Sequence, residues 1–174
     1  HAAIFNNVKA NLIWIDSETY EKDEKKLKEL SEYDGVLVPG GFGETGIEGK
    51  LKVIEYARIN KIPYFGLCYG MQLLVVEYAR NVLGMKDANT VEINPKTQYP
   101  VIDIMPDQKK KLEIRDFGGS MRLGTYPCVV TNNTIAYEAY KKTKIEERHR
   151  HRYEVNPDYV ARLETAGLVF SGKS

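Results

Sequence analysis

Short apolar runs alternate with amphipathic stretches along the first half of the chain. The runs at 8–15, 34–38 and 62–67 are rich in β-branched and aromatic residues, which predicts strands. Between them, the charge-rich stretch 20–32 predicts a surface helix or helical loop. The stretch 47–58 repeats apolar residues at spacings of four and three, which predicts a helix, and 71–78 predicts another. This alternation favours an α/β fold with a doubly wound, mostly parallel sheet flanked by helices.

Two glycine-containing loops follow predicted strands, PGGFG at 39–43 and GLCYG at 66–70. The carboxyl ends of parallel strands share one edge of a sheet, so we expect the two loops to meet there. Gly66 and Gly70 permit a sharp turn from strand to helix, and that turn places Cys68 at a helix N-terminus, where the helix dipole favours a thiolate. We therefore interpret Cys68 as a nucleophile. The loop 39–43 is a candidate source of backbone N–H groups for an oxyanion hole.

Both Cys68 and the loop 39–43 also have interpretations in which they serve only the fold. A cysteine beside an apolar run is more often a small buried hydrophobe, and PGGFG on its own fits a plain turn equally well. The glycines on both sides of Cys68 favour the reactive interpretation. Cys128 has no such turn around it, and we expect it to be structural.

The second half of the chain is less regular. Its patterns predict, in order, a helix end running into a loop at 81–95, a strand at 101–105, a solvated loop at 108–111, a turn and short strand at 116–124, a capped helix at 132–142, and a helix at 158–166.

An unusual alternation occupies 145–156. Histidines at 149 and 151 share one side of an extended strand with Tyr153, and arginines at 148, 150 and 152 share the other. Two histidines without a third ligand at a supporting spacing give a poor match to a metal site, so no metal is expected. A row of arginines suits the binding of a carboxylate or of a neighbouring domain.

Composition narrows the function classes. With 174 residues the chain can form one domain with a proper core, and its net charge of +1 gives no general basis for binding nucleic acid or a membrane. No apolar segment approaches the ~20 residues of a membrane span, and the N-terminus lacks a signal-peptide pattern. The two cysteines fit a reducing compartment, so a cytoplasmic protein is expected.

Five segments occur in the order found in the class I, triad-type glutamine amidotransferase domain of the CTP synthase family. They are PGGFG, GLCYGMQL, KDANTVEINP, GGSMRLG and ERHRHRYEVNP. The Cys68 turn alone is similar to class I amidotransferases in general, whereas GGSMRLG and ERHRHRYEVN narrow the resemblance. It covers nearly all of 1–174, and it implies a single glutaminase domain of flavodoxin-like fold.

The resemblance also implies a chemistry. Cys68 would attack the side-chain carboxamide of L-glutamine, form a γ-glutamyl thioester and release ammonia, and water would then release glutamate. The backbone N–H groups of Gly41 and Tyr69 would form the oxyanion hole. Tyr69 stands where many relatives carry leucine, a mild departure if only its backbone acts.

The family pattern implies a glutamine site as well. Gln72 and Glu92 would orient the substrate amino group, and Arg152, with the backbone beside Tyr153, would hold the α-carboxylate. The full implied set is Gly41, Phe42, Tyr69, Gly70, Met71, Gln72, Glu92, Arg152 and Tyr153.

In this family, ammonia passes to a synthetase domain that uses ATP and Mg²⁺ to aminate UTP to CTP. This sequence has no GxxxxGK[ST] phosphate loop, so that domain is expected elsewhere in a longer parent chain, and this chain alone is expected to be at most a glutaminase without a cofactor. The family's first strand is expected before His1. Its His-Pro-Glu segment, with the general base and the glutamate that orients it, is expected after Ser174. The parent enzyme is expected to be a homotetramer.

Two other function classes stay open. A cysteine hydrolase or glyoxalase of similar fold would use Cys68 without selectivity for glutamine, whereas Glu92 and Arg152 favour an amino-acid ligand. A non-catalytic assembly or regulatory domain is favoured by the missing His-Pro-Glu segment and opposed by the glycine-flanked Cys68.

Overall fold

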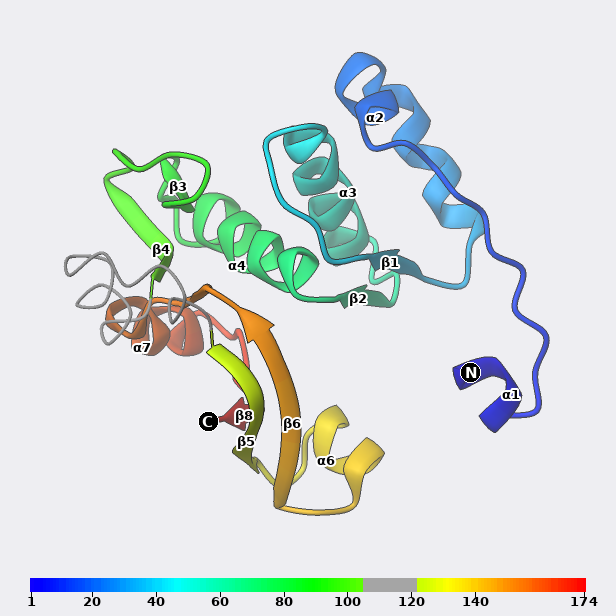
Figure 1. Ribbon diagram of the computed structural model, residues 1–174. Coiled ribbons are helices and arrows are strands. Elements are labelled where there is room, and N and C mark those ends of the chain that lie inside the picture. The colour runs from blue at the N-terminus through cyan, green and yellow to red at the C-terminus, as the bar shows by residue number, and fades with distance from the viewer. Residues whose placement is uncertain (105–121) are drawn as a thin grey trace.

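The computed structural model describes residues 1–104 and 122–174 (Figure 1). Its helices are α1 (Ala2–Phe5), α2 (Glu18–Lys22), the 3-10 helix η1 (Glu24–Glu32), α3 (Ile47–Ile59), α4 (Tyr69–Asn81), α6 (Ile135–Tyr140) and α7 (Pro157–Thr165). Its strands are β1 (Val36–Val38), β2 (Tyr64–Gly66), β3 (Ala88–Thr90), β4 (Tyr99–Ile104), β5 (Arg122–Val130), β6 (Lys144–His151), β7 (Tyr153–Val155) and β8 (Gly172–Lys173). The loop predicted at 108–111, and most of the turn predicted at 116–124, lie outside the described residues.

The described strands form three short sheets where the sequence pattern favoured one. β1 and β2 pair in parallel, with Val38 opposite Gly66. β3 is parallel to β4, whereas β7 runs antiparallel to β4, and β5 pairs antiparallel with β6 and β8. The β1–α3–β2–α4 segment therefore keeps the predicted parallel strand–helix rhythm. The second half departs from it because α6 is only a short connection, which returns the chain directly alongside β5.

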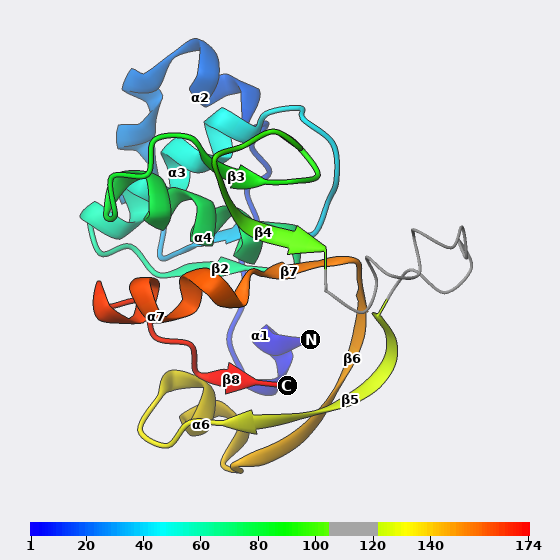
Figure 2. The same cartoon turned by 90° about the vertical axis from the view of Figure 1, so that its left-hand side faces the viewer.

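Helices α3 and α4 lie side by side over β1 and β2, with α2 beyond α3, while α7 and the β5–β6 ribbon lie on the opposite side (Figures 1 and 2). The predicted apolar face of α3 is buried, as Ile47, Leu51, Ile54 and Ala57 show. In α4, Leu73, Val76 and Ala79 have no exposed surface. Helix α4 is thus an interior helix with neighbours on several faces.

A buried ion pair joins these two helices. Glu77 of α4 is fully buried, and its carboxylate accepts hydrogen bonds from Arg58 Nη2 at 2.7 Å and Arg58 Nε at 3.1 Å. Asn81 Nδ2 donates to the same carboxylate at 3.0 Å. A buried carboxylate is costly unless it is paired and hydrogen-bonded, and these donors meet that requirement.

Two expectations for the first half are wrong. Residues 8–15 form no strand, because the chain there has no ladder partner among the described residues, and β-rich composition alone does not fix a strand. Trp14 and Leu12 are exposed. Strands of the predicted sheet, with helices on both sides, would be buried on both faces, yet Leu37 and Phe65 are exposed on the face of β1–β2 that α3 and α4 leave open.

The second half follows most of its predicted pattern. β4, α6 and α7 lie where strand and helices were expected, and Thr134 and Asn156 cap the two helices by accepting hydrogen bonds from backbone N–H groups. The alternating stretch is extended as β6 and β7. The short strand β3 was not predicted. Of the helices in the described parts of the chain, none has the length and apolarity to cross a membrane.

The ion pair between α3 and α4 can be tested by Glu77→Gln. We expect the free energy of unfolding to fall by roughly 3 kcal/mol, the lower end for a broken buried pair, because the partly exposed Arg58 can regain water. The matched change Glu48→Gln disrupts the more exposed pair with Arg80 and should cost about 0–1 kcal/mol. Urea unfolding of both variants measures the difference, and equal losses would contradict it.

Candidate functional site

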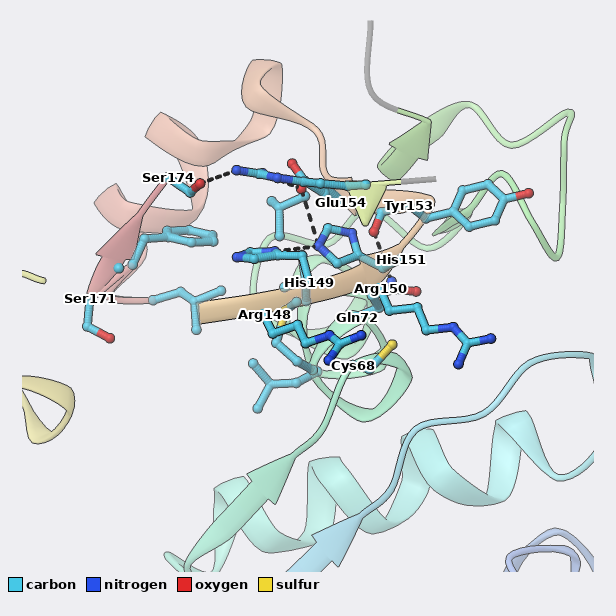
Figure 3. A pocket seen from close by; sticks show the side chains of 18 of the residues that line it. Cys68, Gln72, Arg148, His149, Arg150, His151, Tyr153, Glu154, Ser171 and Ser174 are labelled. Carbon is cyan, nitrogen blue, oxygen red and sulfur yellow. Dashed lines mark hydrogen bonds and ion pairs between the residues drawn. The ribbon is translucent and has the colours of Figure 1, made fainter. Parts of the chain in front are cut away.

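The turn at Cys68 joins β2 directly to α4. β2 ends at Gly66 and α4 begins at Tyr69, and Cys68 has φ of 52° and ψ of −102°. A non-glycine residue rarely adopts a positive φ, and strained residues of this kind gather at functional sites. The Cys68 side chain is exposed and free (Figure 3). The predicted sharp turn from strand to helix is confirmed.

Gly66 and Gly70, on the two sides of this turn, leave no space for a side chain. A Cβ on Gly66 would lie 2.5 Å from the carbonyl carbon of Gly70, and one on Gly70 would lie 2.2 Å from the carbonyl oxygen of Val38. The Leu67 N–H also donates to that Val38 carbonyl at 2.9 Å. Backbone, which cannot swing aside as a side chain can, surrounds both positions. The end of β1 therefore fixes where the turn sits.

The loop 39–43 meets the turn, as expected for loops at the same sheet edge. A Cβ built on Gly40 would lie 3.6 Å from Cys68 Cβ, and one on Gly41 would lie 3.7 Å from Tyr69 Cδ1. The Tyr69 N–H belongs to the first turn of α4, whose amides lack intrahelical acceptors. The glycines of the loop 39–43 therefore lie next to the turn that carries the thiol.

Gln72 lies one turn into α4 and is only 4% exposed. Its Nε2 donates to the Tyr153 carbonyl at 3.1 Å, which ties α4 to β7 across a long stretch of sequence. Its Oε1 is buried and has no hydrogen-bond partner among the described residues. An unpaired buried carbonyl oxygen is costly, so this atom is suited to accept a hydrogen bond from a ligand.

Glu92 lies within electrostatic reach of Arg152, Tyr69 and Tyr153. Burial raises the pKa of Glu92, and the charge of Arg152 only partly opposes that shift. Burial also raises the pKa of Tyr69 to about 12, with the negative charge of Glu92 adding to the effect. The described fold thus brings together residues 69, 92, 152 and 153. Phe42, by contrast, is 90% exposed, and Met71 is partly exposed.

A cavity of about 580 Å³ opens beside the thiol, between α4, β6 and the 168–172 segment (Figure 3). Its lining includes Cys68, Met71, Gln72 and Tyr153 from the predicted set. Glu92 and Arg152 are not part of that lining. The cavity therefore covers one side of the candidate site and extends away from it toward His149 and Phe170.

A second cluster lies on β6 and β7, where His149, His151 and Glu154 place ligand atoms within 4.8 Å of one another. The sequence analysis missed Glu154, because strict alternation assigns it to the arginine side. A bend at Arg152, between strands of two different sheets, turns it toward the histidines. Arg122 Nη1 lies 2.7 Å from Glu154 Oε1, and this positive charge opposes a cation there.

The histidine pair is held within this cluster. His149 Nδ1 and His151 Nε2 are hydrogen-bonded at 2.8 Å. Burial lowers the pKa of His151, so its imidazole stays neutral near pH 7. Within the described residues, neither histidine hydrogen-bonds to Cys68. They project from the face of β6 opposite Arg148 and Arg150 (Figure 3).

A family model for class I glutamine amidotransferases matches residues 1–174. The CTP synthase of Pyrococcus abyssi is 55% identical over 172 residues, which are 99% of this chain and 31% of that protein. The CTP synthase of Clostridium acetobutylicum is 55% identical over 174 residues, or 100% of this chain and 32% of that protein. This chain thus spans about a third of the length of these curated relatives.

A solved structure is also similar, the glutaminase domain of Trypanosoma brucei CTPS with bound acivicin. The two structures superpose with a TM-score of 0.89 at 39% sequence identity, over 98% of this chain and 64% of that one.

The space around the turn predicts losses of stability of different size for two alanine substitutions. Gly70→Ala places a Cβ against the Val38 carbonyl and should destabilise the fold by about 1–3 kcal/mol or more, as overpacking does. Gly40→Ala meets only ordinary van der Waals contacts and should cost well under ~1 kcal/mol. Chemical unfolding of both variants checks this, and a Gly70→Ala protein as stable as Gly40→Ala would contradict the described packing.

Proposed function

This chain belongs to the class I glutamine amidotransferases, and we propose that it hydrolyses L-glutamine through a thioester on Cys68. The likeness to the T. brucei glutaminase domain confirms the fold class predicted from the sequence. The observation that carries the proposal is the strained, glycine-flanked Cys68, which projects at the N-terminus of α4 beside the glycines of a second loop.

The proposed reaction has two halves. The Cys68 thiolate attacks the γ-carbonyl carbon of glutamine, and the carbonyl electron pair moves to oxygen. When the intermediate collapses, the carbon–nitrogen bond breaks, and the nitrogen takes a proton and leaves as ammonia. Water then attacks the thioester, the carbon–sulfur bond breaks, and glutamate and the thiol are released.

The backbone N–H groups of Gly41 and Tyr69 stabilise the oxyanion in this proposal. Tyr69 begins the interior helix α4, and Gly41 lies in the loop 39–43 that meets the turn. Losing one such donor typically costs ~10²–10³ in rate. Gly70 allows α4 to begin this close to the end of β1.

The substrate amino acid is held on the Glu92 side of the turn. Glu92 pairs with the α-ammonium group, which compensates for a partly buried carboxylate that Arg152 does not fully neutralise. Gln72 Oε1 accepts a hydrogen bond from the same group. Arg152 and the backbone beside Tyr153 hold the α-carboxylate, and Phe42 and Met71 border the site from the loop and from α4.

The general base comes from outside the described residues in this proposal. A thiol attack assisted by a base gains ~10²–10⁴ in rate. The two histidines of β6 are engaged with each other and do not hydrogen-bond to Cys68 within the described structure. We assign the base to a His-Pro-Glu segment of a longer parent chain.

We propose that the parent is a CTP synthase of reducing cytoplasm, in which this domain supplies ammonia to a synthetase domain. That domain would use ATP and Mg²⁺ to aminate UTP, and the parent would assemble as a homotetramer. The similarity to CTP synthases along the whole of this chain, over about a third of their length, supports this assignment. No cofactor is proposed for this domain.

Labelling of the full-length protein with a chloroketone analogue of glutamine tests the nucleophile. The thiolate displaces chloride, so intact mass should show one adduct, which peptide mapping places on Cys68. Cys68→Ala should remove the adduct and lower glutamine turnover by at least about 10³-fold, while the matched Cys128→Ala should leave both unchanged.

CTP formation by the full-length protein is measured with the same variants. Cys68→Ala should stop CTP formation from UTP, ATP and glutamine but leave CTP formation from ammonia intact. An adduct on Cys128, or glutamine turnover by Cys68→Ala, would overturn the assignment of Cys68 as the nucleophile. CTP formation absent with either nitrogen source would overturn the parent assignment.

Glu92→Gln tests the ammonium site. Only the ionised carboxylate attracts the substrate ammonium, so KM for glutamine should rise as pH falls through the raised pKa of Glu92. The variant should raise KM by roughly 10–100-fold, the loss of a charged hydrogen bond, and should flatten this pH dependence. Glu55→Gln on α3 is the control and should keep the wild-type profile. A Glu92→Gln enzyme with wild-type KM would contradict the assignment.

A further inference from the structure

Tyr69 stands immediately after the exposed Cys68, yet its side chain is only 3% exposed. Its hydroxyl donates a hydrogen bond to the carbonyl of Gly43 at 2.7 Å. Because burial raises the pKa of Tyr69 to about 12, the phenol keeps its proton at neutral pH and remains a donor. The side chain therefore links the first residue of α4 to the glycine-rich loop, and the link does not depend on pH near neutrality.

The loop that receives this bond has little else to hold it. Residues 39–43 are exposed and belong to neither helix nor strand. Among the described residues, 40–44 take part in no hydrogen bond between backbone groups. Gly43 itself has φ of 83°, and a Cβ built on it would meet nothing within 4 Å. Such a segment samples many conformations unless a side chain fixes it.

The ring of Tyr69 also lies against the middle of the loop. A Cβ built on Gly41 would be 3.7 Å from Tyr69 Cδ1, which is van der Waals contact. The ring therefore lies about one carbon atom's width from the residue proposed to supply one oxyanion donor, while the backbone of Tyr69 supplies the other. A fixed separation between these donors is what electrostatic preorganisation requires.

We propose that Tyr69 is a positioning residue for glutamine hydrolysis. Its hydroxyl anchors the glycine-rich loop at Gly43 and so keeps the N–H of Gly41 at a fixed position relative to the N–H of Tyr69. The inference rests on the proposed glutaminase function. It gives the Tyr69 side chain a role beyond the backbone role that the family pattern implies. Leucine at this position has no hydroxyl and cannot form the link.

The chain offers a matched control in the same helix. Tyr78 donates its hydroxyl hydrogen bond to the carbonyl of Ala166 at 2.6 Å. It is a part-buried α4 tyrosine bonded to a backbone carbonyl, and it lies more than two helical turns from Cys68. Tyr69→Phe and Tyr78→Phe therefore remove the same chemical group from the same helix, one at the turn and one away from it.

The test compares steady-state glutamine hydrolysis by both variants in the full-length enzyme that contains this chain. Tyr69→Phe should lower kcat roughly 10-fold, less than the ~10²–10³ that follows removal of an oxyanion donor, because the donor is loosened and still present. KM for glutamine should stay within about threefold, since the hydroxyl does not touch the substrate. Tyr78→Phe should keep the wild-type kcat and KM.

Two further measurements separate positioning from general damage. Alkylation of Cys68 by iodoacetamide requires the thiol and no oxyanion donor, so its rate should match wild type in both variants. Unfolding by urea should show comparable small losses, about 1 kcal/mol each. A lower kcat in Tyr69→Phe alone, with normal alkylation, supports the proposal.

Other outcomes overturn it. An unchanged kcat in Tyr69→Phe excludes a positioning role, and equal losses of kcat in both variants assign the effect to helix stability. A wild-type enzyme without glutamine turnover would instead refute the proposed function itself.

Discussion

The contact between Gly70 and the carbonyl of Val38 sets the geometry of the whole site. A side chain of any size at Gly70 would push α4 away from the end of β1, because the nearest atom is backbone. With the helix seated there, the Leu67 N–H also reaches the same carbonyl, and only one residue is left to complete the turn. That residue is Cys68, so its exposed thiol follows from how closely a helix approaches a strand.

The backbone of this turn is strained, and the packing of α4 stabilises the fold enough to offset the free energy of that strain. A residue in a sparsely populated backbone conformation costs about 1–3 kcal/mol. Each fully buried aliphatic side chain contributes about 1.5–3 kcal/mol, and α4 buries Leu73, Val75 and Val76 behind the turn. The core therefore outweighs the strain by a clear margin. The rigid helix carries the nucleophile, while the exposed loop 39–43 depends on neighbouring side chains for its position.

The sequence predicted the features that depend on local pattern. Apolar spacing located α3 and α4, and the glycines of 66–70 located the turn. It did not predict that residues 8–15 lack a partner strand in the parts of the chain that the structure describes, since strand pairing depends on residues far away in the sequence. It also missed the place of Glu154, because a change of sheet at Arg152 breaks the alternation. The link from Tyr69 to Gly43 was beyond sequence reasoning too, because it depends on how two loops meet in space.

Two carboxylates near β7 differ in how fully they are compensated. Glu154 already has an arginine partner, because Arg122 Nη1 lies 2.7 Å from its Oε1. Glu92 is within electrostatic reach of Arg152, yet burial raises its pKa in spite of that charge. A carboxylate that already has an arginine partner gains little from a second cation, whereas an incompletely compensated one gains more. An ammonium group beside Glu92, as proposed, therefore gains more from the carboxylate than one beside Glu154 would.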